Sequence, residues 1–205
     1  PAQLMETLLG PYELLLRPEC TGMTELKAQL KGRPALFVMN HSLGGIEMPL
    51  TIKLLHQHGI FVRGLSDHLH FSLPVWGDLI RAMGGVDGTR ANCSALMAAG
   101  KSVLVYPGGA HEVMKGKNDE KYDLMWKERL GFARLAVKHK FTVVPCCCVG
   151  SEDMLDIVRD IPIGWLRKGL SVPLIKPPHP KRLQKLYFCF GAPIETASFG
   201  GGDGG

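Results

Sequence analysis

The sequence predicts an α/β fold: a single domain with a mostly parallel or mixed central sheet flanked by helices. Short, almost continuously apolar runs are typical of strands that are buried on both faces of a sheet. Segments of helical period alternate with these runs along the chain, as they do in helix-covered sheets. The chain has 205 residues, no internal repeat and no obvious linker, so one sizeable core over residues 1–205 is expected.

Residues 1–30 are expected to form an N-terminal helical segment. Within it, Leu4–Leu16 has the pattern of one or two amphipathic helices, broken near Gly10 and Pro11. Residues 196–205, which end in a glycine-rich stretch, are expected to be a flexible tail. A start at proline rather than methionine is compatible with a fragment of a longer protein, whose membrane anchor could lie outside these residues.

Five apolar runs are expected to form strands: Ala35–Met39, Ile60–Leu65, Ser102–Tyr106, Phe141–Val149 and Leu186–Phe190. Five segments between them have helical patterns: Ile46–His58, Leu73–Met83, Arg90–Ala99, Tyr122–Lys140 and Glu152–Arg159. Pro145 falls inside the fourth run. Because proline has no N–H to donate, it indicates an edge, a bulge or a strand end at that position.

The composition limits the classes of function. Hydrophobic residues make up 45% and charged residues 21%, which fits a globular rather than a disordered chain. The formal charge of +5 is compatible with anionic lipid surfaces or substrates, and no basic run is interleaved with aromatics, so nucleic acid is not an expected partner. No apolar stretch reaches the roughly 18 residues that span a bilayer, and no signal peptide is evident.

The six cysteines are expected to be free thiols, packed as small hydrophobes in a reducing compartment. They are Cys20, Cys93, Cys146, Cys147, Cys148 and Cys189. Neighbouring residues of a strand point to opposite faces, so the consecutive three cannot form a compact metal site by themselves.

Residues 161–168 and 174–176 combine Trp165 and aliphatic side chains with basic ones, ahead of Pro177 and Pro178. One interpretation is a contact with a membrane surface, with the tryptophan at headgroup level and the bases toward anionic lipid. The other is an ordinary irregular crossover with a partly buried tryptophan, since a clear helical moment is absent.

The block Asn40–Glu47 contains the strongest candidate for catalysis. His41 follows a buried apolar run and precedes Gly44, Gly45 and Glu47. Near neutral pH a histidine accepts a proton from an alcohol, and a carboxylate holds its tautomer and stabilises the imidazolium that forms. The alternative is a strand-end histidine that is hydrogen-bonded to a loop.

A second block, Gly84–Arg90, contains glycines that let the backbone approach a ligand closely. Arg90 is a candidate for binding a phosphate or a polarised carbonyl. Alternatively, Thr89 caps the following helix and Arg90 is solvated in its first turn.

In a third block, Val103–Glu112, a strand runs into Pro107-Gly108-Gly109. Such a turn presents backbone N–H groups to the polar head of a substrate, or is simply a tight strand exit. It lacks the Lys-Ser/Thr of a P-loop, which argues against nucleotide hydrolysis.

Taken in order, four blocks resemble the motifs of the glycerolipid acyltransferase superfamily, the PlsC-like lysophospholipid and glycerol acyltransferases. These blocks are Asn40–Glu47, Gly84–Arg90, Tyr106–Glu112 and Val143–Cys146, and the resemblance covers roughly residues 34–195. The Tyr-Pro-Gly-Gly form and the run Lys121–Arg134 are similar to the diacylglycerol-acyltransferase-like proteins and plant phytyl ester synthases. Phe190–Ile194 resembles the last strand and turn of the superfamily.

The resemblance implies acyl transfer from a thioester, usually acyl-CoA as co-substrate, to a lipid hydroxyl, with no cofactor. It implies that His41 is the general base and that Glu47 orients it. Pro107 and the backbone N–H groups near Gly108 and Gly109 are candidates for binding the acceptor head or the developing oxyanion. Arg90 is a candidate anion contact, and Glu112 either positions a hydroxyl or holds the loop.

The expected partners are therefore acyl-CoA, a lipid alcohol and a membrane surface, on a reducing (cytosolic or stromal) side of endoplasmic reticulum or plastid membranes.

Two positions depart from the family pattern. Five residues separate His41 from Glu47, where the common motif has four. On a continuous helix the two side chains would lie about 120° apart, so we expect a bend at Gly44 and Gly45. His111 stands where relatives of this branch often carry Arg, so no acceptor phosphate contact is assigned to it.

Two other functions are alternatives: a lipid esterase or hydrolase, and a non-catalytic lipid-binding homologue. The chain has no Gly-x-Ser-x-Gly elbow, although water could replace the alcohol at a His-Glu dyad. Metal binding is not expected, because the paired histidines lack a third spaced ligand. Those residues are His56, His58, His68 and His70, with Asp67 adjacent.

Overall fold

The computed structural model describes residues 2–163, 171–176, 183 and 185–200. Trp165 and the basic residues Arg167 and Lys168 of the expected membrane contact, as well as Pro177 and Pro178, lie outside the described residues. So do the last five residues, 201–205, of the expected tail.

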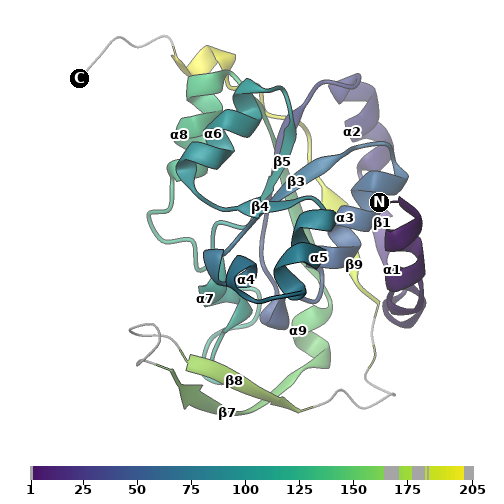
Figure 1. The fold of residues 1–205 in the computed structure, drawn as a ribbon, viewed down its shortest axis with the longest axis vertical. Coiled ribbons are helices and arrows are strands. Elements are labelled where there is room, and N and C mark those ends of the chain that lie inside the picture. Colours follow the sequence, from purple (N-terminus) through teal and green to yellow (C-terminus); the bar gives the residue numbers. More distant parts are fainter. Residues whose placement is uncertain (1, 164–170, 177–182, 184, 201–205) are drawn as a thin grey trace.

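A seven-stranded mixed sheet forms the centre of the fold, with strand order β1-β9-β6-β2-β5-β3-β4 (Figure 1). The pairing is parallel throughout except between β6 and β9. The strands are β1 (Glu19–Thr21), β2 (Ala35–Met39), β3 (Val62–Ser66), β4 (Gly85–Asp87), β5 (Ser102–Val105), β6 (Thr142–Val149) and β9 (Tyr187–Phe190). Two more, β7 (Asp156–Pro162) and β8 (Ser171–Lys176), form a separate antiparallel pair.

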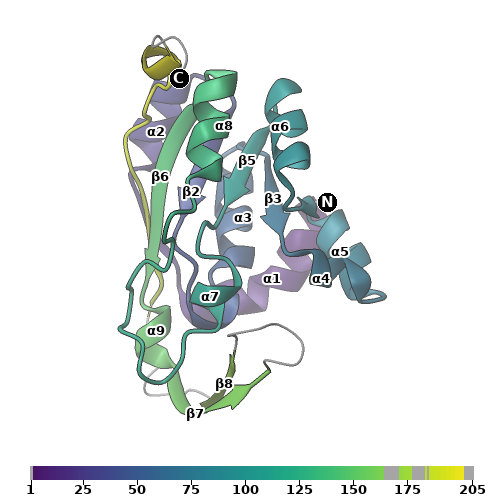
Figure 2. The ribbon, with the colours of Figure 1, turned by 90° about the vertical axis from the view of Figure 1, so that its left-hand side faces the viewer.

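Helices cover both faces of this sheet, and Figure 2 shows α6 and α8 in front of it with α3 behind. The helices are α1 (Ala2–Leu16), α2 (Met23–Leu30), α3 (Met48–Gln57), α4 (His68–Ser72), α5 (Trp76–Ala82), α6 (Arg90–Ala98), α7 (Ala110–Val113), α8 (Gly131–His139) and α9 (Ser151–Met154). In the described part of the chain, 3₁₀ turns span Leu43–Gly45 and Ala197–Gly200. The predicted α/β fold is confirmed.

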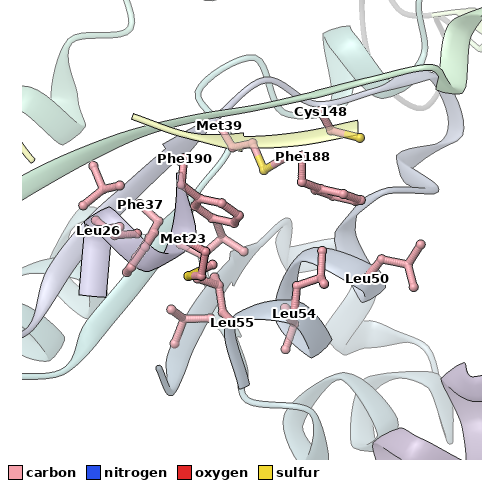
Figure 3. Close-up of a cluster of buried hydrophobic side chains, with 14 of the residues drawn as sticks. Met23, Leu26, Phe37, Met39, Leu50, Leu54, Leu55, Cys148, Phe188 and Phe190 are labelled. Atoms are coloured by element: carbon pink, nitrogen blue, oxygen red, sulfur yellow. The ribbon is translucent and has the colours of Figure 1, made fainter. Parts of the chain in front are cut away.

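The strand β2 divides the hydrophobic core into two layers. Its five residues are all buried, and alternate side chains point to opposite faces of the sheet. Phe37 and Met39 pack into the cluster formed with α1, α2 and α3 (Figure 3). Leu36 and Val38 pack into the cluster formed with α6 and α8. The central position of β2 is thus fixed by its continuous apolar sequence.

The predicted break near Gly10 and Pro11 is wrong, because α1 continues through both residues. Proline removes one intrahelical hydrogen bond, so a compensating contact is needed. The buried ammonium of Lys53 on α3 contacts Glu6, at 2.8 Å, and Glu13. These two carboxylates lie on either side of Pro11 in the sequence. Their ion pairs with one lysine link the two halves of α1 to the same point on α3.

The predicted helix over Tyr122–Lys140 is wrong in its first half, since only α8 is helical. Tyr122 and Lys127 have φ values of 60° and 50°, which a right-handed helix does not allow. The backbone N–H of Tyr122 donates instead to the buried carboxylate of Glu152, at 2.7 Å. A distant side chain therefore replaces the intrahelical partner.

The predicted helix over Glu152–Arg159 is also wrong. The helix α9 ends at Met154, and β7 begins at Asp156. Ile157, Val158 and Ile161 carry β-branched side chains, which favour strands. Pairing with β8 satisfies the backbone of this segment.

Pro145 lies inside β6, which has neighbouring strands on both sides, so the proline marks neither an edge of the sheet nor a strand end. The third alternative, a bulge, is present close to it. Cys146 pairs with Phe190, whereas Val143 pairs with Ile194. The register between the two segments therefore shifts by one residue, because residues 143 to 146 of β6 lie opposite residues 190 to 194. Such a shift defines a β-bulge. The extra residue lies on the partner segment, between Gly191 and Ile194, and Pro145 accepts from the N–H of Gly191 at 2.8 Å without a bond in return.

Among the described residues, no helix has both the length and the apolar character that crossing a membrane requires.

Candidate active site

The candidate site lies at the carboxyl edge of the parallel strands. His41 comes two residues after β2 ends, and Tyr106 comes directly after β5. These strands are neighbours in the sheet, so the two residues leave it side by side. Ligands of open α/β sheets commonly bind at this edge.

The side-chain amide of Asn40 fixes the exit of β2. Its Nδ2 donates to the carbonyl of Cys148 at 2.9 Å, and its Oδ1 accepts from the N–H of Cys148 at 2.8 Å. The buried amide thereby continues the pairing between β2 and β6 beyond the last strand residue. Asn40 was not among the expected site residues, although it directly precedes His41.

His41 and Glu47 are in direct contact. The distance from His41 Nδ1 to Glu47 Oε1 is 2.6 Å, and the glutamate is fully buried. The expected bend is present, since Gly44 and Gly45 have φ values of 72° and 65°, which glycine adopts readily. With Glu47 ionised, Nδ1 carries the proton and Nε2 is the ring nitrogen left to act as a base.

The ring of Tyr106 stacks on the ring of His41. The ring centroids of His41 and Tyr106 are 4.2 Å apart and the planes differ by 23°. Burial, and secondly the charge of Glu47, raises the pKa of Tyr106 well above its usual value. Stacking on one side and the carboxylate at Nδ1 hold the imidazole in one orientation.

Glu112 holds two backbone segments together at the site. One oxygen accepts from the N–H of His41 at 2.8 Å, and the other accepts from the N–H of Met125 at 3.1 Å. Burial raises the pKa of this carboxyl group, and the two backbone hydrogen bonds partly oppose that effect. This geometry favours the loop-holding role for Glu112 over contact with a hydroxyl.

Gly108 provides the space for that carboxylate. A Cβ at this position would lie 2.1 Å from Cδ of Glu112, which is too short for a contact between two carbon atoms. The N–H of Gly109 donates to the carbonyl of Tyr106 at 3.0 Å, which occupies that amide within the turn. Gly109 itself lines the adjacent cavity.

Arg129 clamps the same turn and was not predicted. Its Nη1 donates to the carbonyl of Pro107 at 2.9 Å and to that of Gly108 at 2.6 Å. The sequence signal was its place in the run Lys121–Arg134, which carries the resemblance to the phytyl ester synthases, but no spacing linked it to the turn.

Arg90 lies on the same edge of the sheet but does not line the cavity. It is exposed at the first position of α6, near Gly131 at the start of α8. Thr89 accepts a hydrogen bond from the N–H of Asn92 at 3.1 Å, so it caps α6. The structure thus brings His41, Glu47 and Glu112 together, with Arg90 outside that group.

A cavity of about 290 Å³ opens beside His41. It extends between α3, α5 and the strands β3 and β5, and its wall is mostly apolar. Residues that line it include Met48, Ile52, Leu65, Leu73, Ile80, Met83, Leu104, Val113 and Met114. A site of this size and character fits hydrocarbon rather than a highly charged ligand.

The paired histidines have other partners. His58 Nδ1 contacts the carbonyl of Leu54, and His68 Nδ1 contacts Asp87 at 3.0 Å. His70 Nδ1 accepts from Trp76 at 3.0 Å. Within the described ranges, no three histidine, cysteine or acidic side chains are grouped as a metal site would need.

Comparisons with known proteins agree on the family. A family model described as Acyltransferase matches residues 17–149. The chain is 34% identical to phytyl ester synthase 2, chloroplastic, of Arabidopsis thaliana, over 92% of this chain and 31% of that protein. It is 29% identical to phytyl ester synthase 1, chloroplastic, of the same plant, over 80% of this chain and 28% of that protein.

It is also 28% identical to the human DGAT1/2-independent enzyme synthesizing storage lipids, over 55% of this chain and 34% of that protein. The chain thus spans about a third of the length of these relatives. No solved structure matches it significantly.

Proposed function

Since this chain belongs to the acyltransferase family, we propose that it transfers a fatty acyl group from acyl-CoA to the hydroxyl of a lipid alcohol. One observation carries the proposal: the 2.6 Å contact between His41 and Glu47 lies at the wall of an apolar cavity. This arrangement combines a positioned base with a compartment for hydrocarbon.

The base in this reaction is Nε2 of His41. It takes the proton of the acceptor hydroxyl while Glu47 stabilises the imidazolium that forms. The acceptor oxygen attacks the thioester carbonyl directly, forming a C–O bond, and the C–S bond breaks. The CoA thiolate leaves and takes the proton back from His41, so no acyl-enzyme is formed.

The surrounding residues serve the base and the charges of the substrates. Tyr106, and Glu112 through the His41 amide, limit the movement of the imidazole. Developing charge on the carbonyl oxygen requires an N–H donor, and in this turn the N–H of Gly108 is the candidate, since Pro107 has none and that of Gly109 donates to Tyr106. Arg90, exposed on the same edge, is the candidate contact for an anionic group outside the cavity.

The acceptor class follows from the relatives' names and the cavity. Phytol and partial glycerides are both long hydrophobic alcohols, and an apolar wall suits either. Two of the relatives are phytyl ester synthases and another is an enzyme synthesizing storage lipids. We propose a lipid alcohol of this type as acceptor, in a plastid or endoplasmic reticulum membrane.

Exposed apolar side chains near the cavity support contact with a membrane surface. Leu69 and Leu73 line the cavity and are 50% and 55% exposed, and Val75 and Trp76 follow with 81% and 42% exposed. Leu73→Ser should weaken co-sedimentation with lipid vesicles, whereas Phe199→Ser should not, although Phe199, on another part of the molecule, is even more exposed at 66%. Equal binding by both variants would argue against this rim as the contact.

The decisive experiment measures acyl-CoA consumption with phytol, monoacylglycerol, diacylglycerol, a lysophospholipid or water as acceptor, with products identified by mass. The proposal requires an ester product that depends on His41 and is lost in His41→Ala. His56→Ala is the matched control, because its ring packs on Phe61 instead.

Consumption with water alone would identify a hydrolase. Lipid binding without turnover in the unsubstituted protein would identify a binding homologue.

A further inference from the structure

Two thiols face each other on neighbouring strands, away from the candidate site. Cys147 on β6 is paired in register with Cys189 on β9. Two residues away, the N–H of Gly191 donates to the carbonyl of Pro145 at 2.8 Å. Antiparallel pairs alternate with a period of two, so Cys147 and Cys189 form a hydrogen-bonded pair.

The spacing of such a pair suits a disulfide. In a hydrogen-bonded antiparallel pair the Cα atoms lie about 5.5 Å apart. Disulfides bridge Cα atoms separated by roughly 4.4 to 6.8 Å, most often by about 5.5 to 6 Å. The Cβ atoms of directly opposed residues lie about 4.5–5.5 Å apart, compared with about 3.5–4.5 Å in a disulfide, so closing the bond requires a small approach of the two residues.

The side chains of the pair already interact. Burial raises the pKa of the Cys147 thiol, and the charge and a side-chain hydrogen bond of Cys189 raise it further. The hydroxyl of Thr21, on β1, donates to the sulfur of Cys189 at 3.2 Å. The Cys189 side chain thus interacts with Cys147 on one side of β9 and with Thr21 on the other.

One member of the pair, Cys189, is more accessible than the other thiols on this part of the sheet. Cys189 is exposed and Cys147 is half-buried. Cys146 and Cys148 point to the opposite face, where they pack with the core cluster of α1, α2 and α3, as Cys20 does. Expecting all six thiols to be packed as hydrophobes is therefore wrong for Cys189.

We propose that Cys147 and Cys189 are a redox modification site, which closes to a reversible disulfide with a low-molecular-weight disulfide such as oxidised glutathione. The exposed Cys189 thiolate attacks the oxidant, forming a mixed disulfide and releasing one reduced glutathione. The Cys147 thiolate then attacks the Cys189 sulfur and displaces the second. Two thiols lose two protons and two electrons, and one oxidised glutathione becomes two reduced ones.

The bond would join the last strand of the sheet to its centre and enclose residues 148–188. Cys148, beside the bridge, holds the Asn40 amide that fixes the exit of β2 toward His41. The disulfide would thus form one residue away from Cys148, whose backbone holds the side chain of Asn40 beside the candidate site. It is nevertheless independent of the proposed acyl transfer, because its formation is measured on the thiols themselves.

The experiment treats the reduced protein with oxidised glutathione and maps the products by peptide mass spectrometry, with fragmentation to separate residues 146, 147 and 148. We expect a 147–189 cross-link, a mass lower by two hydrogens, and four instead of six titratable thiols in denaturant. Thermal unfolding should shift upward by roughly 5 °C or more, and dithiothreitol should reverse every change.

Substitutions identify the partners. Cys189→Ser should abolish the cross-link, and Cys147→Ser should leave glutathione on Cys189. Cys20→Ser is the matched control and should retain the 147–189 bond. The proposal is overturned by a glutathione adduct on Cys189 without a cross-link in the unsubstituted protein, by a bond from Cys189 to Cys20, or by cross-links only between two chains.

Discussion

Glu112 accepts a hydrogen bond from the backbone N–H of His41, at 2.8 Å. The same histidine contacts a second buried carboxylate, that of Glu47, through its ring. One carboxylate holds the backbone and the other holds the side chain. Because the two glutamates contact different parts of His41, replacing each with glutamine should have a different consequence.

Glu47→Gln should impair the reaction while leaving substrate binding nearly intact. An amide keeps the size of the side chain but cannot stabilise an imidazolium, and general-base catalysis contributes about 100-fold or more. Single-turnover rates with acyl-CoA should fall by at least about that factor. The control is Glu25→Gln, an exposed residue on α2. An unchanged rate in Glu47→Gln would remove this residue from the mechanism.

Glu112 predicts a specific dependence of stability on pH. Its pKa in the folded protein is raised from the ordinary value of 4.5, chiefly by burial. Folding therefore favours the protonated form, and the contribution of this group is full below pH 4.5 and is lost as the pH rises through the folded-state pKa.

The matching measurement is urea unfolding of the unsubstituted protein and of Glu112→Gln from pH 4 upward. The difference in free energy of unfolding, unsubstituted minus variant, should decrease with rising pH. An increasing difference would mean that folding favours the ionised carboxylate instead.

Arg129→Ala should loosen the turn that follows β5. The guanidinium supplies two hydrogen bonds to the carbonyls of Pro107 and Gly108, and bonds to a charged donor contribute about 1.5–3 kcal/mol each. We expect faster amide hydrogen exchange over residues 106–113. Arg134→Ala, an exposed arginine on α8, should show unchanged exchange over that range. Equal exchange in both variants would show that the clamp is not needed.

Gly108→Ala should destabilise the protein, since its Cβ would lie 2.1 Å from Glu112 Cδ. Relief of that overlap costs about 1–3 kcal/mol, as overpacking commonly does. Gly10→Ala is the matched control: it lies inside α1 with no atom within 4 Å of the added Cβ. It should stabilise by about 0.5–1 kcal/mol. Denaturant midpoints that move the same way for both would contradict the steric explanation.

The sequence could predict what is decided locally. All five expected strands are present, because a run such as Ala35–Met39 has no stable exposed conformation. The bend at Gly44 and Gly45 followed from the spacing between His41 and Glu47, and the contact it was expected to permit is present. The catalytic use of that contact stays a prediction.

What the sequence could not predict depends on distant partners. Tyr122 leaves its helical pattern because Glu152, thirty residues later, accepts its N–H. Arg129 donates to carbonyls of a turn 21 and 22 residues earlier, and no local spacing signals that contact. The short strands β1 and β4 have three residues each, too few for a period to be recognised.

The pairing of β1 with β9 has a consequence for the synthesis of the protein. Thr21 and Cys189 are adjacent in the sheet but 168 residues apart in sequence. In the sheet, β1 has β9 as its one neighbour, so its backbone stays unpaired until β9 has left the ribosome. Closing so long a loop costs entropy before any contact is gained, and such contacts slow folding. On the nascent chain, β1 therefore stays an unpaired strand edge until residues 187–190 have been made.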